Sequence, residues 1–168
     1  MLSCYALQIV KRQKEARPNV STTRAHFAKN VFFGCIDDRI VESHLKFIIK
    51  IGGAFYPAVA GGGLAFIDLS ERDTSLTQVT ASYQINHIDT VYVESHTDCG
   101  AYRLAGVIFA SPEEELSRLY RDLDTASDLI KDALLKAGAG LGEVKIHTRV
   151  VDPDGVVVPR PSHASTAI

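Results

Sequence analysis

Two stretches, FFGCIDDRI at residues 32–40 and VESHTDCGA at residues 93–101, decide how the rest of this sequence is interpreted. Each begins with an apolar run, rich in β-branched or aromatic residues, that predicts a buried strand. Each then continues into side chains that bind soft divalent metals, and together they supply Cys35, His96 and Cys99. Because sites in an open α/β sheet form beyond the carboxyl ends of the strands, the three side chains can meet in space. Three nitrogen and sulfur ligands leave one position of a tetrahedral zinc ion free, as in catalytic zinc sites.

Strands and helices are predicted to alternate along the chain. In order, the patterns predict a strand at 30–35, a helix at 40–46, a strand at 47–51, a helix from 73 or 74 to 86, a strand at 90–94 and a long helix at 112–136. Ser111 and Glu114 have the spacing of a capping box for the long helix. Segments 144–151 and 156–158 flank the turn sequence DPDG and predict a hairpin. We therefore predict an α/β fold in a single domain, with a mainly parallel central sheet flanked by helices and a C-terminal antiparallel hairpin strand.

The sequence suggests three segments. Residues 1–30 are expected to form an N-terminal helix and linker, because apolar residues keep helical spacing from Leu2 to about Glu15. Residues 31–158 are expected to form the zinc-binding domain, and the Pro- and Ser-rich residues 159–168 are expected to be a loose tail. The 168 residues are enough for one domain with a substantial core.

Composition argues against several classes of function. With 46% hydrophobic and 23% charged residues the chain is ordinary for a soluble protein, and a net charge of −2 gives no sign of a nucleic-acid partner. No apolar run approaches the roughly 20 residues of a membrane span. The basic cluster near the N-terminus follows the apolar segment, the reverse of a secretory signal. We expect a cytoplasmic protein with reduced thiols, in which Cys4 is a small residue of the first helix.

The motifs CIDDR at 35–39 and HTDCG at 96–100 resemble the two signature motifs of the β-class carbonic anhydrases. Their order, their separation and the helix between them agree with that family. The final hairpin resembles that of the short, archaeal-like members. The likeness covers roughly residues 31–158.

The resemblance implies a function and a set of site residues. Cys35, His96 and Cys99 would bind Zn²⁺, and a zinc-bound hydroxide would convert carbon dioxide reversibly into bicarbonate, the reaction of a zinc lyase. Asp37 would orient the hydroxide by accepting its hydrogen bond, and Arg39 would keep Asp37 ionised and in place. In this family the counterpart of Asp37 can also bind the zinc ion itself, in a closed resting state.

Some residues depart from the family pattern. The A-G-N segment that commonly follows the second strand is expected here at Gly52, Gly53 and Ala54, without the amide side chain. Asp38 stands where a small residue is usual and adds a carboxylate that can compete for Arg39. Two alternatives therefore stay open: a zinc-binding, carbonic-anhydrase-like protein without hydratase activity, or a hydrolase of CS₂ or COS that uses the same zinc site.

Other residues have weaker claims to a function. His44 and His87 could transfer protons near neutral pH, although an ordinary surface or hydrogen-bonded histidine is the better interpretation of each. Asp98 is expected to cap the short helix that follows it. Nucleophilic catalysis by Cys35 with His96 is possible in principle. Because the amphipathic N-terminal helix needs a partner surface, and because the family resemblance implies dimers, we expect a homodimer or a higher homo-oligomer.

Overall fold

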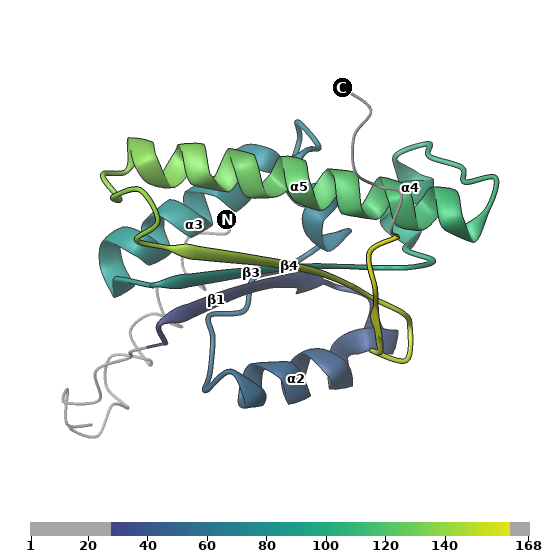
Figure 1. Cartoon of the computed structure of the whole chain (residues 1–168), viewed down its shortest axis with the longest axis horizontal. Helices are drawn as coiled ribbons and strands as arrows, with labels where there is room; N and C mark the ends of the chain where they lie inside the picture. The colour runs from purple at the N-terminus through teal and green to yellow at the C-terminus, as the bar shows by residue number, and fades with distance from the viewer. Residues whose placement is uncertain (1–27, 162–168) are drawn as a thin grey trace, which may run out of the picture.

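The computed structural model describes residues 28–161 and shows one five-stranded sheet covered on both faces by helices (Figure 1). The strands are β1 (Asn30–Cys35), β2 (Ala58–Val59), β3 (Thr90–His96), β4 (Lys145–Val151) and β5 (Val157–Val158). The helices are α2 (Val41–Lys50), α3 (Arg72–Asn86), α4 (Gly100–Leu104) and α5 (Pro112–Lys136), with short 3₁₀ helices η1 (Asp38–Ile40) and η2 (Gly62–Phe66). The predicted N-terminal helix, with Cys4, lies outside the described residues. None of the helices described between residues 28 and 161 has the length and apolarity needed to cross a membrane.

The sheet order is β2-β1-β3-β4-β5, parallel except for the antiparallel pair β4–β5. The α/β prediction, including the C-terminal hairpin strand, is confirmed. β1 and β3 are central strands that are buried along almost their whole length, which explains their apolar runs at 31–33 and 91–93. Helices α3 and α5 lie on one face of the sheet, and α2 lies on the other (Figure 1).

The predicted strand at 47–51 is wrong, because one helix, α2, continues through it. Its last turn is closed by the Ile51 amide, which donates to the Phe47 carbonyl at 3.0 Å. Aromatic and β-branched residues favour strands in general, but here helical spacing lets His44 and Phe47 face the sheet together. The neighbour of β1 is instead the two-residue strand β2, in which Ala58 and Val59 pair with the end of β1.

This correction also moves the loop that follows the second strand. The segment after β2 is Ala60, Gly61 and Gly62, so the placement of the A-G-N counterpart at 52–54 is wrong. Gly62 has a φ of +56°, and a Cβ atom there would lie 1.8 Å from the Glu94 carbonyl oxygen. Only glycine fits such a close approach to the backbone of β3.

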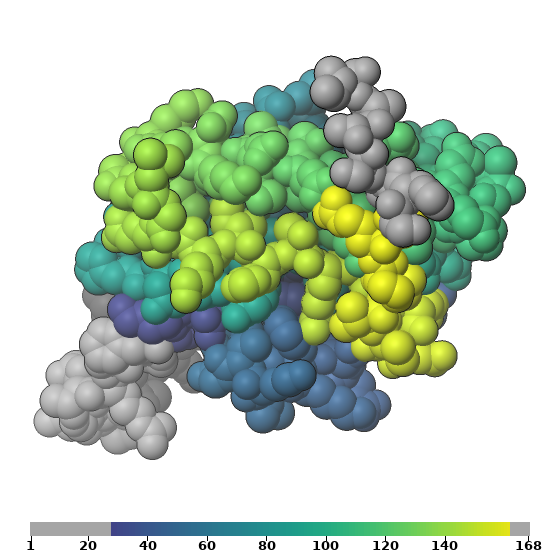
Figure 2. All heavy atoms as spheres, in the orientation of Figure 1, coloured from purple at the N-terminus to yellow at the C-terminus, as the bar shows by residue number. Residues whose placement is uncertain are grey.

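The long helix and the hairpin are formed as predicted. The Ser111 hydroxyl accepts a hydrogen bond from the Glu114 amide at 3.2 Å and caps α5. At the other end of the domain's sequence, the turn of the β4–β5 hairpin reaches across to α2, where the Ser43 hydroxyl donates to the Gly155 carbonyl at 3.4 Å. In the space-filling view the end of this hairpin, in yellow, lies on the right of the front face, between α5 and α2 (Figure 2).

Candidate metal centre

Three predicted ligands converge at the carboxyl edge of the sheet. Cys35 ends β1, His96 ends β3, and Cys99 directly precedes α4. Their ligand atoms all lie within 4.8 Å of one another, and all three residues are buried. The two sulfur atoms are 3.8 Å apart. The structure thus brings together side chains that the sequence places in separate motifs.

The strand register explains the convergence. β1 and β3 are parallel neighbours, with Phe33 opposite Val93, so their carboxyl ends reach the same edge of the sheet. After His96 the chain turns sharply at Asp98, whose φ is +54°. That turn returns the backbone toward β1 and places Cys99 beside Cys35.

The two ring nitrogens of His96 have different surroundings. Its Nδ1 lies 2.9 Å from the Thr97 carbonyl oxygen, which can only accept, so this hydrogen bond assigns the proton to Nδ1. Its Nε2 is buried, has no hydrogen-bond partner among residues 28–161 and belongs to the same cluster as the two sulfur atoms. A buried acceptor without a partner needs an explanation, and a metal ion bound at Nε2 supplies one.

The two thiols shift each other's pKa in opposite directions. The Cys99 thiol beside Cys35 lowers the pKa of Cys35 well below its usual range, with further help from His96 and from backbone amides. The same contact, together with burial, raises the pKa of Cys99 well above its usual range. The Gly61 amide also donates to the Cys35 sulfur at 3.3 Å. A thiolate sharing a proton with a neighbouring thiol suits a soft divalent cation, which would take the place of that proton.

A carboxylate stands beside these three donors. Asp37 Oδ2 is 3.7 Å from His96 Nε2. Arg39 holds the same carboxylate through two side-chain hydrogen bonds, from Nε to Oδ1 at 2.9 Å and from Nη2 to Oδ2 at 2.7 Å. These bonds lower the pKa of Asp37 to about 2 despite partial burial. Asp37 and Arg39 are therefore a pair of fixed geometry next to the ligand cluster.

Asp98 binds Arg39 rather than capping the following helix, so its predicted role is wrong. Cys99 is the N-cap residue of α4, and within the described part of the chain its side chain makes no capping hydrogen bond. Arg39 Nη1 donates to the Asp98 carboxylate at 2.8 Å, and Nη2 donates to the Asp98 carbonyl at 2.9 Å. The side-chain bonds of Arg39 therefore go to Asp37 and Asp98 within the described residues, and the expected competition from Asp38 is not observed.

The two histidines considered for proton transfer lie in unlike places. His44 is fully buried and hydrogen-bonded to Tyr56 and Glu94, which confirms its interpretation as a hydrogen-bonded histidine. His87 is exposed at the end of α3, before β3 begins, and so lies toward the edge of the sheet opposite His96. Neither is a surface group beside the cluster.

A cavity of about 580 Å³ lies next to Cys99. It lies between α4 and the start of α5, and its apolar lining includes Val107, Ile108 and Phe109. Asp98 and Arg103 lie at its polar side. The cavity offers a small uncharged molecule an apolar space beside one of the three donors.

No protein-family model and no curated protein matches this sequence. Solved structures do. The chain superimposes on the β-carbonic anhydrase CafA of Aspergillus fumigatus with a TM-score of 0.50 and 16% identity, over 95% of this chain and 89% of that one. The chain has the β-carbonic anhydrase fold. Weaker likenesses are to the carbonic anhydrase of Streptococcus mutans, with TM-score 0.46, 20% identity and coverage of 96% and 100%, and to the apo form of a carbon disulfide hydrolase, with TM-score 0.44, 15% identity and coverage of 96% and 92%. In this chain's version of the β-carbonic anhydrase fold, the buried Cys-His-Cys cluster lies at the carboxyl edge of β1 and β3.

Proposed function

We propose that this protein is a zinc-dependent carbonic anhydrase, which hydrates carbon dioxide reversibly to bicarbonate. The observation that carries the proposal is the buried cluster of Cys35, His96 and Cys99, in which His96 Nε2 has no hydrogen-bond partner in the part of the chain that the structure describes. Two thiolates and one imidazole are ligands typical of zinc, and three of them leave a position for a reacting molecule. The two sequence motifs and the fold support the same family.

The ion would be held by Cys35, His96 and Cys99. When bound, zinc supplies the Lewis acidity that makes water a nucleophile near neutral pH. The Thr97 carbonyl fixes the tautomer of His96, and the Gly61 amide stabilises the charge on the Cys35 sulfur.

Asp37 orients the attacking water in this proposal. Its carboxylate lies beside the donor cluster and can accept a hydrogen bond from a water molecule there. With a pKa of about 2, Asp37 stays ionised at neutral pH and acts as an acceptor rather than as a store for the released proton. Arg39, itself held by Asp98, keeps the carboxylate in this orientation. The closed state, with Asp37 bound to the ion, would require those contacts to Arg39 to change.

The apolar cavity beside Cys99 favours a small uncharged substrate. Carbon dioxide satisfies this condition, and so do its linear analogues CS₂ and COS. Hydrolysis of CS₂ or COS at the same centre is therefore the second candidate function. A zinc protein without activity is the third possibility, which kinetics would reveal.

Stopped-flow hydration of carbon dioxide by the zinc-loaded protein at about pH 8.5 tests the proposal. Replacement of Asp37 by alanine should lower kcat/KM by at least about tenfold while one zinc ion stays bound, because an orienting group beside the metal is lost. Asp38→Ala is the matched control, since Asp38 is the adjacent, exposed carboxylate and should leave the rate unchanged. A wild-type protein that holds zinc but hydrates nothing across the pH range would contradict the proposal, and turnover of CS₂ or COS by it would favour the second candidate.

A further inference from the structure

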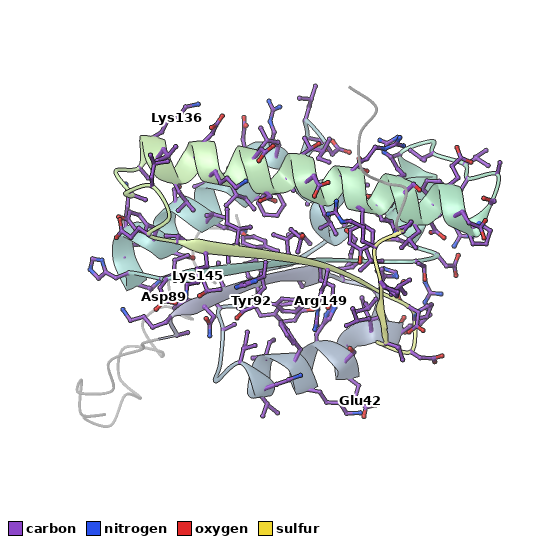
Figure 3. All side chains as sticks on the ribbon, in the orientation of Figure 1. Glu42, Asp89, Tyr92, Lys136, Lys145 and Arg149 are labelled. Carbon is purple, nitrogen blue, oxygen red and sulfur yellow. The ribbon has the colours of Figure 1, made fainter. Side chains whose placement is uncertain are left out.

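A chain of buried polar groups lies between the sheet and α2, next to the metal cluster. Glu94 and His44 are both fully buried, and His44 Nε2 lies 2.6 Å from Glu94 Oε1. Arg149 Nε donates to Glu94 Oε2 at 2.5 Å, and Tyr56 contacts His44 Nδ1 through its hydroxyl. Figure 3 shows Arg149 on the side of the sheet that faces α2, and its guanidinium carbon lies 3.4 Å from the centre of the Phe47 ring.

The donors and acceptors of this hydrogen-bond chain fit together when His44 carries one ring proton. A buried carboxylate is stable only when it is paired and hydrogen-bonded, and Glu94 receives bonds from Arg149 and from His44. In that arrangement the proton of His44 lies on Nε2, facing Glu94, and Nδ1 accepts a hydrogen bond from the Tyr56 hydroxyl. Burial, followed by the charges of Glu94 and Cys35, raises the pKa of Tyr56 to about 12, so its hydroxyl keeps the proton that it donates.

The backbone next to Cys35 leaves space for this hydrogen-bond chain. A Cβ atom at Gly34 would lie 2.7 Å from the His44 ring, so the glycine before Cys35 makes room for the imidazole. Glu94 lies two residues before His96 on β3, and Arg149 is its partner in β4. The polar chain therefore contacts the strands that end in two of the three ligands.

Tyr56 connects the hydrogen-bond chain to Cys35 through the loop between α2 and η2. Three residues after Tyr56, Val59 pairs with Cys35, and its carbonyl accepts the Ile36 amide at 3.1 Å. Two residues later, the Gly61 amide donates to the Cys35 sulfur at 3.3 Å. The position of this amide depends on where the loop is fixed, and the Tyr56 hydroxyl fixes the loop to His44.

We propose that Tyr56, His44 and Glu94 are positioning residues for the metal centre, because their hydrogen-bond chain holds the loop that delivers the Gly61 amide to the Cys35 sulfur. This inference rests on the zinc centre of the proposed function. It gives a role to two buried residues, Glu94 and His44, that take no part in the proposed hydration mechanism. Hydrogen bonds to ligating atoms tune the affinity and electronic properties of a metal site. Their loss should therefore change the metal affinity and the absorption spectrum of the bound metal.

The test is Tyr56→Phe, which removes one hydroxyl and keeps the ring. Zinc affinity is measured by competition with a chromophoric chelator, and the sulfur-to-cobalt charge-transfer band is recorded after cobalt substitution. We expect Tyr56→Phe to weaken zinc binding about tenfold and to shift the band. Glu94→Gln, which preserves shape but removes the charge, should change both in the same direction.

Tyr120→Phe is the matched control for a purely structural effect. The buried Tyr120 hydroxyl donates to the Val158 carbonyl at 2.6 Å, from α5 on the opposite face of the sheet. Its loss should lower the melting temperature of the metal-free protein without moving the zinc affinity or the cobalt band. If Tyr56→Phe binds both metals as the wild type does, the positioning role is overturned while the zinc centre stands. If the wild type binds neither metal, the zinc centre is wrong and this inference falls with it.

Discussion

At Gly62 the loop after β2 packs closely against β3, the strand that ends in His96. A Cβ atom at this position would lie 1.8 Å from the Glu94 carbonyl oxygen, and the φ of +56° is itself unfavourable for other residues. We predict that Gly62→Ala lowers the free energy of unfolding by about 3 kcal/mol, from the clash and the left-handed backbone together. Denaturant unfolding of the reduced, metal-free protein measures the loss.

Gly106 separates the two contributions in that prediction. It also has a positive φ, +75°, but no atom of residues 28–161 lies within 4 Å of the place its Cβ would take. Gly106→Ala should therefore cost only about 1 kcal/mol, the backbone part alone. Equal losses for the two variants would show that the contact with Glu94 is less tight than the structure indicates.

The Cys-His-Cys cluster could be predicted from residue types alone. Few side chains bind soft cations, and the two motifs contain three such side chains. The same reasoning could not assign Asp98 or Gly61. The contact of Asp98 with Arg39 depends on a backbone turn with positive φ, and Gly61 acts through an amide that every residue except proline possesses. The role of Glu94 was missed, although its position was informative. A charged residue inside a buried central strand requires a buried partner.

Among the elements, α2 shows where pattern reading fails. The segment from Phe47 to Ile51 has strand-like composition, and a run this short has no clear period. It is helical because α2 has to cover one whole face of the sheet, on which Phe47 packs against Phe32. β2 could not be predicted, since a strand of two residues leaves no alternating pattern. By contrast, α5 has a cap, a proline in its first turn and a long amphipathic repeat, and its predicted bounds are confirmed.

The cap of α5 makes a prediction for that element. The Ser111 hydroxyl accepts from the Glu114 amide, one of the first-turn donors that have no partner within the helix. Ser111→Ala should lower the free energy of unfolding by about 1 kcal/mol, whereas Ser111→Asp, which keeps an acceptor, should retain most of it. If both variants unfold at the same denaturant concentration as the wild type, the capping bond contributes nothing to stability.

At the scale of the whole molecule, the outer face of α2 is a candidate contact surface for the expected oligomer. Val41, Leu45 and Ile49 are four residues apart, so they form one line along the helix, and all three are exposed. A continuous apolar line in water is typical of a surface that binds another protein. It supports the prediction of a homodimer or higher homo-oligomer, and it assigns a face to the contact.

We predict that the protein self-associates and that Ile49→Glu shifts it toward the monomer, because a carboxylate in an apolar interface loses its hydration without gaining a partner. Light scattering coupled to size-exclusion chromatography measures the mass at several concentrations. Ile85→Glu is the matched control: Ile85 is 74% exposed on α3 and Ile49 is 78% exposed on α2, so both changes add the same charge at a similar exposure. A wild type that is monomeric at every concentration, or two variants that dissociate alike, would exclude α2 as the contact face. Dissociation of Ile49→Glu alone would place the subunit contact on α2, the helix that carries the buried His44.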